Sequence, residues 1–452
     1  MGTAEYVPER ESTEPSGNGA DYLEPGHEGR VRDTLPADPV RSTRLRPAGL
    51  QRIPAAAPVL NRIGASLRSA WPVFVIFLAQ RLLTVAFVYH YARSARNLFL
   101  RWDAGWYYRL AQGGYVYPHF SADGRLRASN LAYFPLYPLL SHWISRTGLV
   151  SLSQAMLLLS WFGGLLAVWA IFAFGNSLYG RSVGIALCAV FGMAPASLTF
   201  AMSYPEPLYI AAAAAAILAL MRRRPVWAGA LALVAGLLRP TAVVLIATIG
   251  IYFLVELGRW LVWRRSHPVG ALERSDPGTE MTTTDLAPGR AFIGAVLSTL
   301  GVAAFMVYVG FRTGEVFGYF TVQNQWGLRS ASSLGEYLKA VEHGLFHSPA
   351  ASFIPVTLAV GLGYVLLYCF IVFDRRLVWA SIYAGLLLVT SLAHVTFQHA
   401  MGRELIAGAF IYLIPVARMR VSRIGAITAI TVGSILMAWG SAQFLITPGT
   451  GM

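Results

Sequence analysis

The protein is 452 residues long, 56% of them hydrophobic and only 13% charged. A soluble domain carries about a quarter charged residues, so this composition excludes an ordinary soluble enzyme. The formal net charge is +14, but the arginines stand in short clusters between long apolar runs. That pattern is typical of cytoplasmic loops and not of a nucleic-acid groove, so we expect no nucleic-acid partner.

The first 70 residues contain Pro, Gly, Ser and charged residues without hydrophobic periodicity. This composition predicts a disordered tail over residues 1–70. No apolar region of signal-peptide length follows Met1. Arginines without any acid after Asp38 precede the apolar run 71–91, so the positive-inside rule predicts a cytoplasmic N-terminus.

The rest of the chain is dominated by apolar runs. At about 20 apolar residues per crossing, these runs supply about ten to twelve spans. We therefore expect an all-α, polytopic transmembrane bundle over 71–446. Further arginine clusters predict cytoplasmic loops, of which 259–290 is the longest, and leave 93–132 and 312–350 as external loops. The expected spans are 71–91, 153–175, 183–200, 206–221, 226–238, 240–258, 291–311, 351–373, 377–394, 405–417 and 425–446.

The stretch 133–146 does not fit an alternating topology. An even number of crossings must separate the external loops on either side of 133–200, but this region holds three apolar stretches. Pro135 and Pro138 interrupt the shortest of them, and irregular backbone inside a membrane needs a protein environment or a cavity. We expect 133–146 to be a re-entrant or interfacial helix.

The first external loop carries an acid among aromatic residues. On a helix, Trp102, Trp106 and Leu110 share an apolar face with Leu98 and Phe99 nearby, which predicts an amphipathic helix lying on the membrane. Asp103 is the only acid of that helix. It is either a water-facing residue of an interfacial aromatic belt or a functional carboxylate, and spacing alone leaves both readings open.

Three further charged residues stand at ends of apolar runs. Glu206 lies between two prolines, where it is either functional or an exposed turn residue. Arg239 suits a phosphate group, but it could also pair with Glu206 or extend toward the membrane surface. Arg403 could likewise hold phosphate or pair with Glu404.

Two other groups have weaker patterns. Gln325 and Trp326 belong to an amide and aromatic cluster of the kind that binds sugars, although ordinary loop composition explains it equally well. His394 and His399 are five residues apart and do not share a helix face, so we expect no metal site there. The sequence has neither a phosphate-binding P-loop nor a dinucleotide fingerprint.

Four motifs follow one another along the chain: Arg101-Trp102-Asp103-Ala104-Gly105-Trp106-Tyr107 with Gly114-Tyr115, Phe134-Pro135-Leu136-Tyr137-Pro138, Tyr204-Pro205-Glu206-Pro207-Leu208, and Arg239-Pro240-Thr241. Their order over about residues 70 to 420 resembles the PIG-V mannosyltransferases. These are membrane glycosyltransferases of the GT-C fold, whose eukaryotic member adds the second mannose of the glycosylphosphatidylinositol anchor. The arginine-rich composition resembles that of a bacterial, actinobacterial member. Pro207 and Ala242 replace the family's usual Ser and Gly.

This resemblance implies mannose transfer from polyprenyl phosphate to an acceptor hydroxyl on the outer face of the cell membrane, with inversion. Asp103 would be the general base, Glu206 would orient the acceptor or assist Asp103, and Arg239 and Arg403 would stabilise the departing phosphate. The acceptor would be a glycolipid, a glycan or a protein. No cofactor is implied, and a lipid monophosphate carries too little charge to require a metal. The other residues expected to contact substrate are Arg101, Trp102, Trp106, Tyr107, Tyr137, Tyr204, Gln325, Trp326 and His399.

Other functions fit parts of the pattern. A transporter or flippase of a lipid-linked or anionic substrate would also place Glu206 and Arg239 in the membrane, but its charges would lie near the bilayer midplane. Here most of them stand at the outer ends of spans. A structural or assembly partner without catalysis, and a transferase of another pentose or hexose, are the remaining alternatives.

Overall fold

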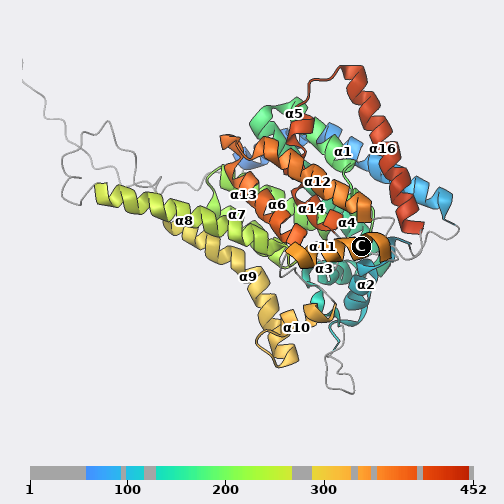
Figure 1. The fold of residues 1–452 in the computed structure, drawn as a ribbon, viewed down its shortest axis with the longest axis horizontal. Coiled ribbons are helices and arrows are strands. Elements are labelled where there is room, and N and C mark those ends of the chain that lie inside the picture. Colours follow the sequence, from blue (N-terminus) through green and yellow to red (C-terminus); the bar gives the residue numbers. More distant parts are fainter. Residues whose placement is uncertain are drawn as a thin grey trace, which may run out of the picture. The chain divides into compact units, whose positions relative to one another are not determined.

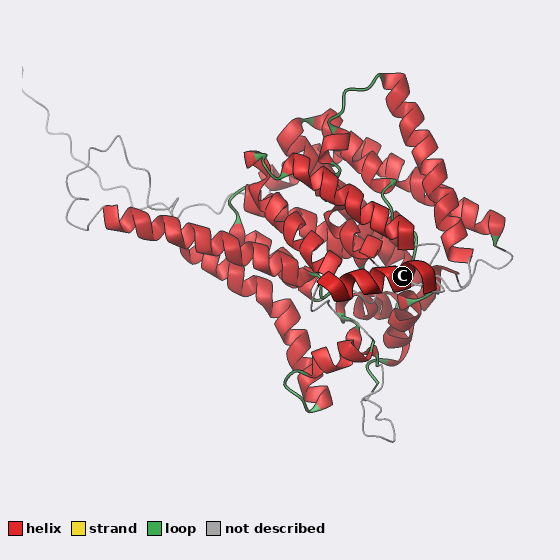
Figure 2. Cartoon of the chain, viewed as in Figure 1, coloured by secondary structure: helices red, strands yellow, loops and turns green. Residues whose placement is uncertain are grey.

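The computed structural model describes residues 57–92, 98–116, 129–266, 288–326, 334–347, 354–393 and 401–446. All regular elements in these segments are helices (Figures 1 and 2), which confirms the all-α expectation. The first half contains α1 (Ala57–Tyr91), η1 (Leu98–Leu100), α2 (Asp103–Gly113), η2 (Asn130–Ala132), α3 (Leu136–Ser145), α4 (Leu152–Tyr179), α5 (Arg181–Gly192), η3 (Ser197–Phe200), α6 (Glu206–Met221) and α7 (Pro225–Gly236). The second half contains α8 (Ala242–Ser266), α9 (Pro288–Thr313), α10 (Gly318–Gln325), α11 (Leu334–His347), α12 (Ile354–Ile371), η5 (Arg375–Leu377), α13 (Val378–Ala393), α14 (Met401–Tyr412), α15 (Ile414–Ala417) and α16 (Arg423–Ile446).

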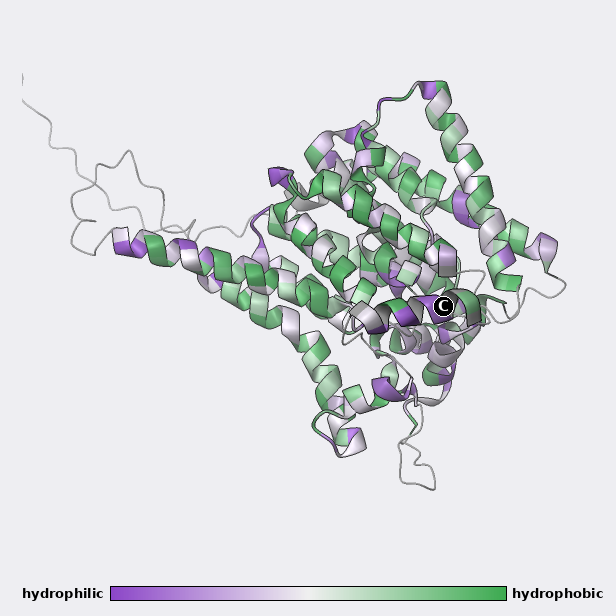
Figure 3. Ribbon diagram, viewed as in Figure 1, coloured by the Kyte–Doolittle hydropathy of each residue, from purple (hydrophilic) through white to green (hydrophobic). Residues whose placement is uncertain are grey.

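Among the described residues, six helical segments are long and apolar enough to cross a membrane. They are Gly64–Tyr91, Leu152–Tyr179, Ala242–Ser266, Pro288–Thr313, Arg375–Ala393 and Arg423–Ile446. Four shorter apolar helices accompany them: Arg181–Gly192, Glu206–Met221, Pro225–Gly236 and Pro355–Ile371. Figure 3 shows hydrophobic residues along most of these helices. The chain therefore has the architecture of a multi-pass membrane protein. The expected number of about ten to twelve spans is reached only when the four shorter helices are counted with the six long ones.

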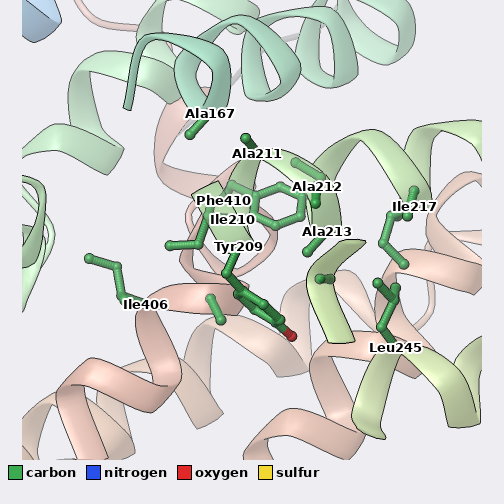
Figure 4. Close-up of a cluster of buried hydrophobic side chains, with 14 of the residues drawn as sticks. Ala167, Tyr209, Ile210, Ala211, Ala212, Ala213, Ile217, Leu245, Ile406 and Phe410 are labelled. Carbon is green, nitrogen blue, oxygen red and sulfur yellow. The ribbon is translucent and has the colours of Figure 1, made fainter. Parts of the chain in front are cut away.

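Helix α6 lies at the centre of the hydrophobic core (Figure 4). Its residues Tyr209–Ala214 are almost fully buried. The same hydrophobic cluster contains Ala167 of α4, Leu245 of α8 and Phe410 of α14. The small side chains of an alanine-rich helix allow neighbouring helices to approach its backbone closely. This packing fixes the start of α6, where Glu206 lies.

Helices α7 and α9 run parallel in close contact through glycines. A side chain on Gly229 would clash with the backbone of Gly294, and one on Gly301 would clash with the carbonyl of Leu233. Gly236 likewise lies against Val302. Because pairs seven residues apart on both helices meet in the same order, small residues set the distance between these two helices. The turn that carries Arg239 follows directly after α7.

The backbone between α5 and α6 is irregular, so the expected span 183–200 is wrong. Helix α5 ends at Gly192, and Ala196 adopts a left-handed conformation with φ of 65° before η3. The guanidinium of Arg81, a buried residue of α1, donates to the carbonyls of Gly192 (2.6 Å) and Ser197. These bonds satisfy carbonyls that a continuous helix would have paired internally.

One other boundary differs from expectation, and the short helix at 133–146 agrees with it. Helix α1 begins at Ala57, so the segment 57–70 is helical and the tail boundary at residue 70 is wrong. The composition of residues 1–70 as a whole predicted disorder, whereas the helix continues through Ala, Leu and Arg on the N-terminal side of the apolar run. Helix α3 has ten residues, or roughly 15 Å, which is half the thickness of the hydrocarbon core. This length supports a helix that does not cross.

Candidate active site

Asp103 opens helix α2 directly after a strained residue. Trp102 has φ of 55° and ψ of −127°, a conformation that residues with a side chain rarely adopt. This turn separates η1 from α2, so the apolar face expected from Leu98 to Leu110 is not continuous. The buried face of α2 is instead formed by Ala104, Tyr107, Leu110 and Ala111. Strained backbone of this kind persists only where the surrounding structure maintains it, and it is frequent at functional sites.

Both carboxylate oxygens of Asp103 have protein partners. The hydroxyl of Tyr133 donates to Oδ1 at 2.9 Å, and Nη1 of Arg403 contacts Oδ2 at 2.5 Å. The Asp103 side chain is 22% exposed. The structure therefore excludes a carboxylate that only faces water. Burial, followed by the charge and hydrogen bond of Asp103, raises the pKa of Tyr133, so its hydroxyl remains a donor.

Glu206 is the buried acid of the site. Its side chain is 2% exposed, and its Oε1 pairs with Nη1 of Arg239 and, at 3.1 Å, with Nε of Arg403. Arg403 consequently bridges Asp103 and Glu206, and the four side chains balance their charges. Arg239 thus has the pairing with Glu206 that the sequence offered as one alternative. Arg403 pairs with these two acids rather than only with its neighbour Glu404.

Two buried oxygens beside these ion pairs have no hydrogen-bond partner among the residues that the structure describes. They are Oε2 of Glu206 and the hydroxyl of Tyr204. The Arg403 guanidinium lies 5.5 Å from the centre of the Tyr204 ring. Ser160 fixes the Tyr204 backbone by accepting from its N–H at 2.9 Å and donating to its carbonyl at 2.6 Å. Unsatisfied buried polar groups are costly and mark positions where water or a ligand can bind.

An aromatic group adjoins Asp103. The rings of Trp106 and Tyr133 are stacked with an interplanar angle of 11°, and Trp326 meets both edge-on at 5.0 and 5.6 Å. Tyr107 contacts Tyr133 edge-on at 5.0 Å. Trp326 is held by a hydrogen bond from its indole N–H to the carbonyl of Ser129 at 3.2 Å. Residues from three separate segments therefore form one aromatic wall next to the acid.

Several other candidates have partners other than the two acids. Arg101 donates to the carbonyl of Leu445 and lies over the Trp102 ring, which itself contacts Phe444 of α16. Arg101 and Trp102 thus attach the loop to α16.

The hydroxyl of Tyr137 is engaged with the carbonyl of Met156 at 2.8 Å and with Ser160 at 3.0 Å. Gln325 ends α10 beside Trp326. His399 and His394 lie outside the described residues.

Two residues that matter for the site were not expected from sequence. Tyr133 holds Asp103, and Arg81 supports the segment that leads to Glu206. Tyr133 precedes the Phe134-Pro135 motif, but nothing in that spacing shows that its hydroxyl reaches another helix. Arg81 interrupts an apolar helix, and an arginine inside a predicted span is a signal that could have identified it.

Comparisons with known proteins leave the family open. Neither the protein-family models nor the curated proteins give a match. Among solved structures, the chain is similar to the apo oligosaccharyltransferase of Archaeoglobus fulgidus, with a TM-score of 0.45, 13% identity, and coverage of 84% of this chain and 56% of that chain. It is also similar to ArnT from Cupriavidus metallidurans bound to undecaprenyl phosphate, with a TM-score of 0.44, 16% identity, and coverage of 84% and 63%. The chain spans less than two thirds of either structure, and membership of the PIG-V family stays a prediction.

Proposed function

We propose that the protein is an integral membrane glycosyltransferase that moves mannose from a polyprenyl phosphate to an acceptor hydroxyl on the outer face. The observation that carries the proposal is the position of Asp103. Its carboxylate is oriented by Tyr133 and Arg403 at the start of α2 and adjoins the Arg403–Glu206–Arg239 chain. A carboxylate can accept the proton of an attacking hydroxyl, and neighbouring cations can stabilise a departing phosphate. The choice of mannose rests on the motif resemblance.

In this proposal Asp103 accepts the proton of the acceptor hydroxyl. As that proton leaves, the acceptor oxygen forms a bond to the anomeric carbon, and the bond from that carbon to the phosphate oxygen breaks on the opposite face. The electron pair departs with the polyprenyl phosphate, and one displacement inverts the anomeric centre. A positioned general base contributes about 10² to 10⁴ in rate.

The arginines supply charge where the phosphate departs. Arg403 and Arg239 each use part of their guanidinium group on the acids, and a guanidinium has five N–H donors in a planar fork that matches phosphate oxygens. Fixed donors aimed at developing negative charge lower the barrier without reorganisation. The pairing with Glu206 and Asp103 keeps both arginines in place before the donor arrives.

The remaining groups suit a sugar. The free oxygens of Glu206 and Tyr204 can bond sugar or acceptor hydroxyls, which would satisfy both buried groups. Trp106 and Trp326 offer aromatic surface beside Asp103. The partners in this proposal are the lipid-linked donor within the membrane and an acceptor that is a glycolipid, a glycan or a protein.

The test compares Asp103→Asn with a matched aspartate variant. Asp374 also accepts a hydrogen bond from a tyrosine, Tyr179, at 2.8 Å and lies 3.8 Å from an arginine, Arg418, but it lies in the loop before α13. Membranes with equal amounts of wild type, Asp103→Asn or Asp374→Asn are incubated with radiolabelled polyprenyl phosphate mannose and a lipid and polymer extract. We expect transfer to fall at least 100-fold in Asp103→Asn only.

Each other result has a definite meaning. Equal transfer by all three proteins would show that Asp103 is not the base. No transfer by wild type from mannose, pentose or other hexose donors would contradict the transferase, and the same membranes would then be tested for movement of the labelled lipid between leaflets.

A further inference from the structure

A cavity of about 520 Å³ lies at the end of the bundle away from Glu206. It is bounded by the last residues of α4 and α6, the second half of α8 and the start of α13. Helix α6 runs over 16 residues from Glu206 to Met221. At 1.5 Å per residue, its two ends are roughly 24 Å apart. The cavity shares no lining residue with the candidate active site.

The rim of the cavity is strongly basic. The arginines that line it are Arg222, Arg223, Arg259, Arg375 and Arg376, and all five are exposed. Glu256 is the one acid in the lining, and its carboxylate accepts from Nη1 of Arg259 at 2.9 Å. The lining therefore carries four net positive charges, and four of its arginines come from the two loops that follow α6 and α12.

The floor of the cavity is apolar. Leu218, Leu220 and Tyr252 are buried in the core beneath the arginines. The ring of Tyr252 packs against Trp379 with centroids 4.8 Å apart. A basic rim over an apolar floor matches a ligand that is anionic at one end and apolar next to it.

The backbone at the rim is strained. Arg223 has φ of 55°, a left-handed conformation that favours glycine. The turn is closed by hydrogen bonds from Arg223 N–H to the Leu220 carbonyl at 2.9 Å and from Arg224 N–H to the Ala219 carbonyl at 2.8 Å. The chain thus holds an arginine at this edge of the cavity in a conformation that residues with a side chain rarely adopt.

We propose that this cavity binds the phosphate of an anionic phospholipid headgroup. Arginine forks match phosphate oxygens, and basic pockets between transmembrane helices bind anionic headgroups. A soluble phosphate compound would use the same arginines, but it would leave the apolar floor unused. The arginine clusters also predict that this end of the bundle faces the cytoplasm, where anionic lipids concentrate. The test must exclude the alternative that any exposed arginine, inside or outside the cavity, attracts the anionic lipid equally well.

The experiment measures equilibrium binding of fluorescent phosphatidylglycerol to the full-length protein in neutral detergent. Arg375→Gln/Arg376→Gln removes two rim charges. The matched control is Arg264→Gln/Arg265→Gln, because these arginines are also adjacent and exposed, lie at the end of α8, and do not line the cavity. We expect the rim variant to bind roughly 30-fold more weakly and the control to bind within about threefold of wild type.

Further arms decide the nature of the ligand. Arg222→Gln, on a different loop, should weaken binding in the same direction, and labelled phosphatidylcholine should not bind saturably. Unchanged elution and melting temperature without lipid establish that each variant is folded. Equal weakening in the rim and control variants would overturn the proposal. Competition by glycerol 3-phosphate as strong as that by the lipid would assign the cavity to a soluble phosphate instead.

Discussion

Replacement of Arg403 by glutamine tests whether the four charged side chains form one unit. Arg403 contacts both Asp103 and Glu206, and with Arg239 the group is electrically neutral. Arg403→Gln leaves two acids beside a single cation. The neighbouring Glu206 is 2% exposed, so water cannot compensate for the lost charge.

The magnitude follows from burial. Breaking a buried ion pair costs about 3–5 kcal/mol, whereas an exposed pair contributes about 0–1 kcal/mol. The side chain of Arg403 is 16% exposed and that of Asp103 is 22% exposed, which is closer to the buried limit. We expect Arg403→Gln to lower the free energy of unfolding by about 3 kcal/mol. Combining it with Asp103→Asn restores neutrality, so the double variant should lose less than the sum of the single losses, by about 1–2 kcal/mol.

The assay is a double-mutant cycle measured by unfolding in mixed micelles of detergent and sodium dodecyl sulfate. The control cycle uses Arg418→Gln and Asp374→Asn, whose 3.8 Å pair is 50% and 25% exposed. Its coupling should be below about 1 kcal/mol. Additive losses in the Arg403 and Asp103 cycle would refute the reasoning, because side chains that interact cannot be independent.

Three further predictions concern catalysis, packing and metals. Tyr133→Phe removes the hydroxyl that donates to Asp103 at 2.9 Å and should lower the proposed mannosyl transfer by about 10- to 100-fold at equal protein abundance. Unchanged transfer would show that this hydrogen bond does not orient Asp103 for the proposed reaction. Gly294→Ala places a Cβ against the carbonyl of Pro225 and should lower the free energy of unfolding by about 1–3 kcal/mol in the micelle assay. The control, Gly289→Ala, has nothing within 4 Å of the added Cβ and should change this free energy by less than about 0.5 kcal/mol. Equal effects of the two substitutions would contradict the contact between α7 and α9. We also propose that transfer is unaffected by EDTA, because a leaving lipid monophosphate would carry little charge and the candidate site already holds Arg239 and Arg403. A loss of transfer that Mg²⁺ or Mn²⁺ restores would disprove this.

Much of the candidate site could be predicted because its residues conflict with their local surroundings. An acid between prolines at Glu206 and an arginine between apolar runs at Arg239 both stand out against a hydrophobic background. Asp103 is visible for the same reason within an aromatic loop. Arg81 has this signal too, although its structural role in pairing the carbonyls of Gly192 and Ser197 appears only in the folded chain.

Pairings could not be predicted in the same way. Asp103 and Arg403 are 300 residues apart, and Tyr133 reaches Asp103 from another segment. Sequence spacing left open whether Asp103 faces water and whether Arg403 pairs with Glu404. The packing of α2 decided the first question, and the approach of α14 to α6 brings Arg403 to Glu206.

The sequence by itself determined the all-α membrane architecture and most helix positions. Hydrophobic run length is a local property, and a segment in the bilayer must satisfy its backbone hydrogen bonds within its own helix. The tertiary structure alone decided where irregular backbone is tolerated, as at Ala196 and Trp102, and which charges neutralise one another. Both depend on contacts between distant segments: a strained turn or a buried charge is stable only when partners from other helices surround it.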